Sequence, residues 1–274
     1  LQKRAGLPER SLALGDGVTM PLVPVPAGRF VMGDVAGLPD EFPQAVVAID
    51  QPFYMAKFEV TNRQYALFDP MHDSAYMDAR GKDRFTRGYP VNEPDQPVVR
   101  VTWHEAMAFC RWLSARTGYE CTLPTEAQWE WACRAGSATA WSFGDSFEKV
   151  RDVANVADST LSGWGWGRVD NSYSDGARFS VPGGKYAPNA WGLADMHGNV
   201  AEWTRTEYRP YPYVDGDGRN DTNLLTPKVV RGGSWNDTFR YSRSASRWRF
   251  LPQQPVYNVG FRVIGTPRKL ADAK

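Results

Sequence analysis

The densest set of chemically active side chains lies near the C-terminus, in residues 230–263. This stretch holds six arginines against a single acidic residue, Asp237, and seven aromatic residues are interspersed among them. Guanidinium groups pair with carboxylates in a planar, two-pronged geometry and stack on aromatic rings. The stretch contains neither Cys nor His. It could therefore be an active site without thiol or imidazole, a binding face, or part of the core.

Thiol chemistry is limited by the number and spacing of the cysteines. The chain has three, Cys110, Cys121 and Cys133, and no two of them have CxxC spacing. At least one is unpaired within the chain, and a structural zinc site is not indicated. No cysteine follows Cys133.

The three histidines do not suggest a metal site either. A non-haem iron centre needs two His and a carboxylate. His104 falls in the first turn of an expected helix, His197 in a Gly-rich turn and His72 in a loop. We expect each of them to be a satisfied polar residue.

Glu126 and Glu130 could form an acid–base pair, because spacing of i, i+4 places both carboxylates on one face of a helix. The alternative, which we favour, is structural. Both lie in the first turns of a helix, where a negative charge complements the helix dipole and can pair with Arg.

Three helices are expected to position these groups, and all three begin with the same capping box. In this pattern a Thr side chain and a Glu or Gln three residues later each accept a hydrogen bond from a free backbone N–H. An apolar stripe at i, i+3, i+4 and i+7 within residues 106–113 supports the second helix. The boxes are Thr61–Gln64, Thr102–Glu105 and Thr125–Gln128.

The remaining chain predicts one domain. Residues 1–19 show no clear periodicity and are expected to form an N-terminal arm. Residues 20–265 contain no linker or repeat and form the domain, and 266–274 form a C-terminal tail. The 25 Gly, 20 Pro, 11 Trp and 12 Tyr indicate a loop-rich protein stabilised by aromatic packing.

Composition also narrows the partners. A net charge of +1 argues against nucleic acid. No apolar run approaches the roughly 20 residues of a membrane span, so no transmembrane segment is expected. The chain begins at Leu1 without a basic-then-apolar leader, as a mature exported chain or a trimmed one would. The compartment stays open, with a slight preference for a secreted, periplasmic or surface-associated protein.

Several phrases of the sequence occur together in one known family. Their order resembles the sulfatase-modifying-factor, or formylglycine-generating-enzyme-like, family from about residue 20 to residue 264. The resemblance implies an α+β fold: a single compact domain related to C-type lectins, with a few helices, small antiparallel sheets and much irregular chain. The phrases are PVPAGRFVMGD (24–34), FEVTNRQYALF (58–68), PVVRVTWHEAMAFCRWLS (97–114), LPTEAQWEWACRAG (123–136), NAWGLADMHGNVAEW (189–203), VVRGGSW (229–235) and NVGFRV (258–263).

The family resemblance does not by itself imply an activity. Its formylglycine generators use copper held by two cysteines shortly after the GGS motif, but the corresponding stretch here, 236–242, has no Cys. We therefore expect no copper and no formylglycine formation. The family also contains iron-dependent sulfoxide synthases, siderophore-tailoring oxidoreductases, non-catalytic modules and retroelement-diversified binding proteins, so membership fixes the fold and not the chemistry.

The resemblance further implies structural Ca²⁺, which accepts mixed carboxylate, amide and carbonyl oxygens. The alternative for the first site is that Glu202 forms an ion pair with a C-terminal Arg and Asp195 caps a turn. The positions matching the first family site are Asp195, Gly198 and Val200 (both through carbonyls) and Glu202. Those matching the second are Asn155, Val156 (carbonyl), Asp175 and Ala177 (carbonyl).

Two further expectations concern motif residues. Cys110 and Cys133 match family positions that form disulfides with C-terminal cysteines in secreted relatives. Because those partners are absent, we interpret both as buried small hydrophobes, with a Cys110–Cys133 bond as the alternative. Four arginines at motif positions are expected to pair with buried acids and carbonyls: Arg231, Arg243, Arg247 and Arg262.

Between those arginines lie side chains at positions that carry variable ligand contacts in diversified relatives. Tyr and Trp there would provide large contact areas at low entropic cost. The alternative is that half of these rings belong to the core. The positions are Phe239, Tyr241, Ser246, Trp248, Phe250, Leu251, Gln254, Val256 and Tyr257.

The sequence thus predicts a pseudoenzyme of this family: a non-catalytic, calcium-stabilised binding or scaffold module. It would present an aromatic and Arg-rich surface at 236–257 to a protein or peptide ligand. The alternative is an oxidoreductase with chemistry other than the copper–dicysteine type.

Overall fold

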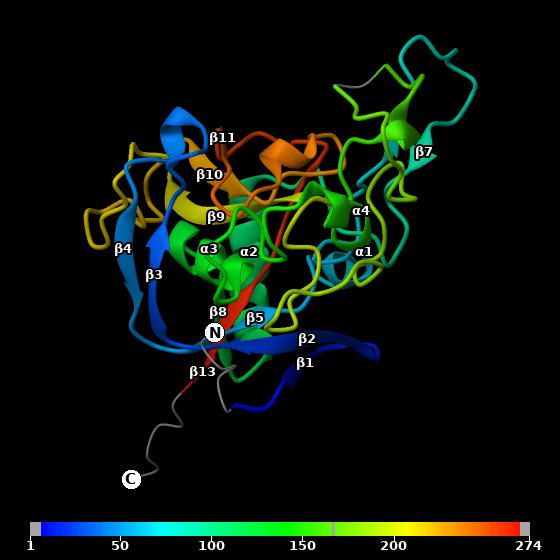
Figure 1. The fold of residues 1–274 in the computed structure, drawn as a ribbon. Helices are drawn as coiled ribbons and strands as arrows, with labels where there is room; N and C mark the ends of the chain where they lie inside the picture. The colour runs from blue at the N-terminus through cyan, green and yellow to red at the C-terminus, as the bar shows by residue number, and fades with distance from the viewer. Residues whose placement is uncertain (1–6, 166–167, 269–274) are drawn as a thin grey trace.

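The computed structural model describes residues 7–165 and 168–268, and two sheets enclose its helices (Figure 1). The larger sheet has five antiparallel strands in the order β1-β2-β5-β13-β8, and the second has four in the order β11-β10-β9-β12. The first set comprises β1 (Arg10–Gly15), β2 (Val18–Val25), β5 (Phe53–Ala56), β8 (Tyr119–Thr122) and β13 (Ile264–Pro267). The second comprises β9 (Ala201–Glu207), β10 (Lys228–Arg231), β11 (Arg247–Phe250) and β12 (Val259–Phe261).

The longer helices lie between the two sheets, and the short helices lie to one side of them among long loops (Figure 1). Two small hairpins complete the strands, and only the β9–β12 pair of the four-stranded sheet is parallel. The helices are α1 (Asn62–Ala66), α2 (Trp103–Arg116), α3 (Glu126–Arg134) and α4 (Val150–Val153). The hairpins are β3 (Gly28–Met32) with β4 (Ala45–Ile49) and β6 (Tyr76–Met77) with β7 (Tyr89–Pro90).

All three capping boxes are confirmed. The side chains of Thr61, Thr102 and Thr125 each accept a hydrogen bond from the backbone amide three residues later. In return, the backbone N–H of each Thr donates to the Gln or Glu side chain at that position. The stripe predicted on α2 is also buried against the core. Local chemistry alone therefore sets where these helices begin.

The predicted N-terminal arm is wrong for residues 10–19. They form β1 and the start of β2, a hairpin at the edge of the five-stranded sheet. Leu12 and Leu14 point inward and are 4% and 1% exposed, while Ser11 and Ala13 face out. This two-residue period spans only one short strand before the turn at Asp16, which is too short for the sequence pattern to indicate a strand. Residues 266 and 267 of the predicted tail belong to β13; residues 1–6 and 269–274 lie outside the described part.

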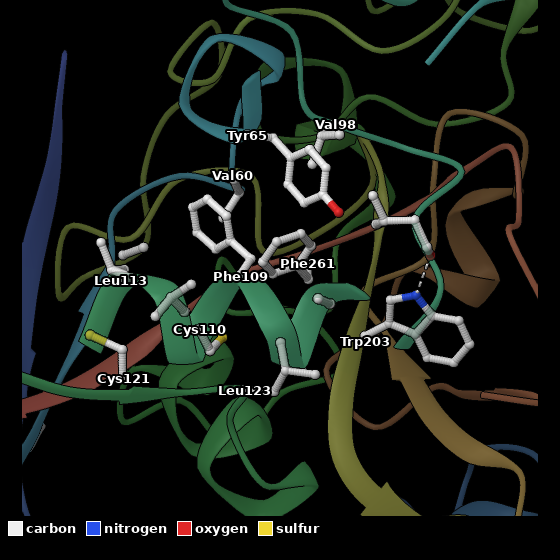
Figure 2. Close-up of a cluster of buried hydrophobic side chains, with 14 of the residues drawn as sticks. Val60, Tyr65, Val98, Phe109, Cys110, Leu113, Cys121, Leu123, Trp203 and Phe261 are labelled. Atoms are coloured by element: carbon white, nitrogen blue, oxygen red, sulfur yellow. Dashed lines mark hydrogen bonds between the residues drawn. The ribbon is translucent and has the colours of Figure 1, made fainter. Parts of the chain in front are cut away.

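Aromatic packing holds the sheets to the helices. Tyr65 of α1 stacks on Phe109 of α2 with ring centroids 5.6 Å apart, and Phe261 of β12 meets Phe109 edge-on at 5.4 Å (Figure 2). Trp203 of β9 closes this cluster and donates from its indole to the Val101 carbonyl. Segments from four separate parts of the chain thus share one core.

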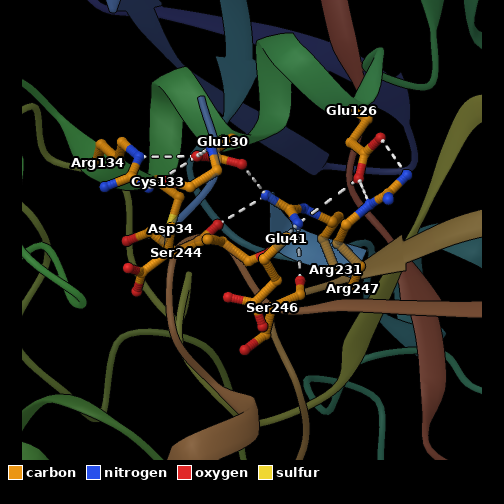
Figure 3. Close-up of polar contacts among 12 residues, drawn as sticks. Asp34, Glu41, Glu126, Glu130, Cys133, Arg134, Arg231, Ser244, Ser246 and Arg247 are labelled. Atoms are coloured by element: carbon orange, nitrogen blue, oxygen red, sulfur yellow. Dashed lines mark hydrogen bonds and ion pairs between the residues drawn. The ribbon is translucent and has the colours of Figure 1, made fainter. Parts of the chain in front are cut away.

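A buried ion-pair network joins α3 to the four-stranded sheet (Figure 3). Arg231 of β10 donates to Glu130, and Arg134 contacts the other oxygen of the same carboxylate at 2.8 Å. Arg247 of β11 donates from Nε to Glu126 Oε1 at 2.6 Å. The side chains of both glutamates, Arg231 and Arg247 are fully buried. The structural interpretation of Glu126 and Glu130 is therefore confirmed.

These elements form a single compact α+β domain with much irregular chain, as predicted. Within residues 7–165 and 168–268, none of the helices is long and apolar enough to cross a membrane.

Removing one member of the buried pair is expected to be costly. Arg231→Met should lower the free energy of unfolding by about 3–5 kcal/mol, because Glu130 would keep its charge in a dry site with only part of its compensation. Urea denaturation measures this. Arg63→Met is the matched control, since Arg63 pairs with Asp95 at 3.0 Å on the exposed surface and should change little. Equal effects of the two substitutions would contradict a structural role for the buried pair.

Candidate functional site

The three thiols are buried and unpaired, so the Cys110–Cys133 bond is not formed. Cys110 lies on the buried face of α2, whereas Cys133 lies on α3 among Trp129, Trp131 and Met196. Burial raises the pKa of Cys133 to about 12 and raises those of the other two thiols as well. Thiols held in the neutral form are poor nucleophiles and poor metal ligands. The interpretation of Cys110 and Cys133 as buried small hydrophobes is confirmed.

In the stretch after the GGS motif, the possible metal ligands are oxygen atoms and not thiols. Ser234 Oγ donates to Asp237 Oδ2 at 2.7 Å, and Ser242 Oγ donates to the Phe239 carbonyl at 2.9 Å. Trp141 in turn donates from its indole to Ser242 Oγ at 3.3 Å. Cu(I) requires soft sulfur ligands. Residues 236–242 therefore do not fit a copper centre of the dicysteine type.

Two of the histidines, His197 and His72, form hydrogen bonds within the structure. His197 contacts the Ser242 carbonyl through Nδ1 at 2.7 Å and Ser142 Oγ through Nε2 at 3.0 Å. A carbonyl can only accept, so Nδ1 carries the proton and Nε2 is the acceptor. Burial lowers the pKa of His197 to about 4, which keeps the ring neutral. His72 Nε2 contacts the Val99 carbonyl at 2.9 Å, far along the chain from the His197 cluster.

The first predicted calcium site is brought together, but Glu202 has other partners. Arg262 approaches Glu202 Oε1 at 2.8 Å, and the Trp129 indole donates to Oε2 at 2.7 Å. Asp195 accepts from the Gly184 amide through Oδ2, while its buried Oδ1 has no partner. The alternative interpretation of Glu202 is thus what the structure shows, and Asp195 keeps one free acceptor.

Glu59 belongs to the same buried cluster and was not predicted. Its Oε1 accepts from Asn199 Nδ2 at 3.0 Å, and its buried Oε2 has no partner. Burial, and then the nearby charge of Asp195, raise the pKa of Glu59 well above its ordinary value. The one signal in the sequence was an acid between Phe58 and Val60, immediately before a capped helix.

The second predicted calcium site also gathers its side chains. The two oxygens of Asp175 accept from the amides of Val156 at 2.9 Å and Ala177 at 2.8 Å. The Ala177 carbonyl accepts from Thr160, and Asn155 Oδ1 is buried without a partner. Burial raises the pKa of Asp175 to about 6.

Free oxygens at Asp195 and Asn155 fit the donor chemistry of Ca²⁺, but the clusters are not closed cages. In the part of the chain that the structure describes, no group of three or more His, Cys, Asp and Glu side chains is arranged to hold a metal ion. Any Ca²⁺ bound here would depend on carbonyl oxygens as well. Gly198 and Val200 would supply these beside Asp195, and Val156 beside Asn155.

The predicted aromatic surface divides into exposed and half-buried members. Trp248 and Leu251 are 38% and 41% exposed, Gln254 is exposed, and the Tyr241 ring lies 5.5 Å from that of Trp248. We name these four residues, together with Arg240, the β11 face. Arg249 points to the other side of β11, where its guanidinium stacks on Tyr208 with 4.5 Å between the guanidinium and the ring centre.

The other predicted contact residues pack against the interior. Phe239 packs beside Trp141 at 5.7 Å, Phe250 meets Trp203 at 6.2 Å, and Tyr257 lies 5.9 Å from Trp235. Val256 is also half-buried against the core. Ser246 must be corrected: it is 1% exposed and its hydroxyl donates to the Arg240 carbonyl, because it follows the turn that brings β11 back to β10. It cannot contact a partner from this position.

The four motif arginines are structural, as predicted. Arg231, Arg247 and Arg262 are paired with Glu130, Glu126 and Glu202 in the interior. Arg243 pairs with Glu41 at 2.6 Å and with Asp34 at 3.2 Å. Their charges are therefore unavailable to a ligand.

The fold and this site define a compact α+β domain whose three cysteines are buried and unpaired. The chain belongs to the sulfatase-modifying factor enzyme 1-like domain family, whose model matches residues 16–267. It is 30% identical to the formylglycine-generating enzyme of Bos taurus, over 88% of this chain and 73% of that protein. It is also 30% identical to that of Mycobacterium tuberculosis, over 90% and 98%.

Another relative is the inactive C-alpha-formylglycine-generating enzyme 2 of Bos taurus, 29% identical over 92% of this chain and 90% of that protein. Among solved structures, PvdO from Pseudomonas aeruginosa superposes with a TM-score of 0.74 at 28% identity, covering 95% of this chain and 99% of that one. Treponema denticola variable protein 1 shares the fold, with a TM-score of 0.73 at 20% identity over 94% and 99%.

The neutral, buried His197 predicts a specific dependence of stability on pH. Its pKa falls from 6.5 to about 4 on folding, so the unfolded chain binds more protons between these values. Stability should drop as pH falls through this window, by about 3 kcal/mol for this residue. The measurement is urea unfolding at pH 7, 5.5 and 4 for the wild type and His197→Gln.

The comparison of slopes isolates His197, because the raised pKa values of Asp175 and Asp195 act in the opposite direction in both proteins. The variant should lose less stability than the wild type on acidification. Identical pH dependences would show that His197 is already protonated at pH 7 or is exposed.

Proposed function

We propose that this protein is a non-catalytic binding module that presents residues 236–257, and chiefly the β11 face, to a protein or peptide ligand. The observation that carries the proposal is the division of labour within one stretch. Its motif arginines point inward and pair with buried glutamates. The side chains between them that point outward are aromatic, apolar or polar, and among the described residues they form no ion pair.

The position of β11 suits recognition. Among the strands of the described residues it pairs with β10 alone, so it is an edge strand of its sheet. An edge strand offers free N–H and C=O groups to which an extended peptide can add. Trp248 and Tyr241 lie beside this edge, and rigid aromatic rings give large contact area with little entropy to lose.

The distribution of thiols supports a role other than cysteine oxidation. The copper chemistry of formylglycine generators needs a reactive thiol pair, and this chain has three buried thiols with raised pKa values and none after Cys133. A relative of similar length carries the name inactive C-alpha-formylglycine-generating enzyme 2. The name alone indicates that the family retains members without that activity.

The catalytic alternative has a direct test. The purified protein is incubated with copper, O₂ and a cysteine-containing peptide, and the peptide is analysed by mass spectrometry. We expect the cysteine to remain unchanged. Conversion to an aldehyde, or stoichiometric copper or iron in the purified protein, would overturn the non-catalytic proposal in favour of an oxidoreductase.

The binding proposal predicts the effect of two substitutions. Trp248→Ala or Tyr241→Ala should reduce capture of the partner from the native source at least about tenfold, as expected for an aromatic anchor at an interface. Quantitative mass spectrometry of the captured proteins gives the ratio. The melting temperature should change little, because Trp248 is 38% exposed and lies outside the core clusters.

Phe85→Ala is the matched control, since Phe85 is 81% exposed in the loop between β6 and β7. It removes an exposed ring elsewhere and should leave capture intact. Equal loss with Phe85→Ala, or unfolding of the Trp248→Ala variant, would count against a β11 binding face.

We further propose that Ca²⁺ stabilises the domain at Asp195 and Asn155, each of which has a buried side-chain oxygen without a hydrogen-bond partner. EDTA should lower the melting temperature by about 5 °C or more, as loss of a tightly bound ion does. Elemental mass spectrometry should find calcium, and Asp195→Ala and Asn155→Ala should each lower its content. An unchanged melting temperature together with calcium-free protein would eliminate both sites.

A further inference from the structure

Arg205 differs from the other arginines of the interior. It lies on β9, half-buried, and its Nε is buried without a hydrogen-bond partner. Within residues 7–165 and 168–268 no carboxylate forms an ion pair with its guanidinium, whereas Arg231, Arg247 and Arg262 each have one. A guanidinium removed from water without a partner is unfavourable.

The surroundings of Arg205 form a pocket of about 440 Å³. It lies between the end of β4, the start of α3 and the loop 213–221, and Arg205, Gln128, Tyr213 and Asn220 are among its lining residues. Tyr213 Oη accepts a hydrogen bond from Asn220 at 3.0 Å, so its own hydrogen is free to donate. Donors therefore surround the inner part of this pocket.

The rim of the pocket has the opposite charge. Asp50, Asp215 and Asp221 line it and are exposed. Gly216 lies between two of them in a left-handed conformation with open space around it. Asp215 lies close enough to favour the charged form of Arg205, but burial outweighs this and lowers the pKa of the guanidinium. The pocket therefore has a cation inside and carboxylates at its mouth, and among the described residues neither Arg205 nor these aspartates form an ion pair.

We propose that this pocket binds a small zwitterion, with its carboxylate on Arg205 and its ammonium group at the aspartate rim. The planar fork of Arg matches a carboxylate. A volume of this size suits a small molecule. The pocket shares no residue with the β11 face, so this site is independent of the binding function proposed above.

Three probes of equal chain length separate the two ends of the ligand: 6-aminohexanoate, hexanoate and hexylamine. Isothermal titration of the wild type should give saturable binding of 6-aminohexanoate, weaker binding of hexanoate and none of hexylamine. Arg205→Gln should weaken binding of 6-aminohexanoate about tenfold or more, because one charge-assisted contact is lost. Asp215→Asn with Asp221→Asn should weaken 6-aminohexanoate but leave hexanoate unchanged.

Arg63→Gln is the control, as it removes an exposed arginine on α1 that is paired with Asp95. It should bind like the wild type. If Arg205→Gln does not fold, the Nε–Hε resonance of Arg205 in ¹H–¹⁵N spectra of the wild type decides, and it should shift on titration with 6-aminohexanoate. No saturable binding of either carboxylate, an unchanged affinity in Arg205→Gln, or an unmoved Nε resonance would overturn the proposal.

Discussion

The buried pairing of Glu130 with Arg231 is the constraint on which the domain depends. Both side chains are fully buried. The Arg231 guanidinium also donates to the carbonyls of Ser244, Ala245 and Ser246, so it binds the turn before β11 as well as the helix. A charge buried away from water needs a partner of opposite charge. A shift of α3 against β10 would leave both Glu130 and Arg231 without this partner. This pair therefore fixes the position of α3 relative to the four-stranded sheet.

The same constraint explains why the C-terminal stretch can present a varied surface. Arg231 and Arg247 face each other across the β10–β11 ladder and point into the glutamates of α3, so the alternation of the strand sends Trp248 to the other side. The inward-pointing arginines, paired with these glutamates, stabilise the fold. The outward set then contributes little to the core, and its side chains are free to differ without loss of the fold.

What could be predicted from the sequence follows from the range of the interaction. The capping boxes were correct because Thr61 and Gln64, for example, need only each other. The family resemblance supplied the fold and the inward arginines, but not their specific partners: Glu126 and Arg247 lie 121 residues apart. Glu59 and Arg205 were missed for the same reason. Their unpartnered atoms become visible only when distant segments are brought around them, and no local pattern marks an atom that lacks a partner.

The scaffold also shows that the fold does not depend on paired thiols. Asp237 and Ser242 close their own turns through Ser234 and Phe239, bonds that involve no sulfur. Cys133 contributes as an apolar group between α3 and the His197 turn, where its neutral thiol meets Ser244 and the Met196 carbonyl. The forces that hold α3, β10 and β11 together are ionic and aromatic. A chain that keeps those arginines, glutamates and tryptophans can therefore keep this core with different side chains after the GGS motif.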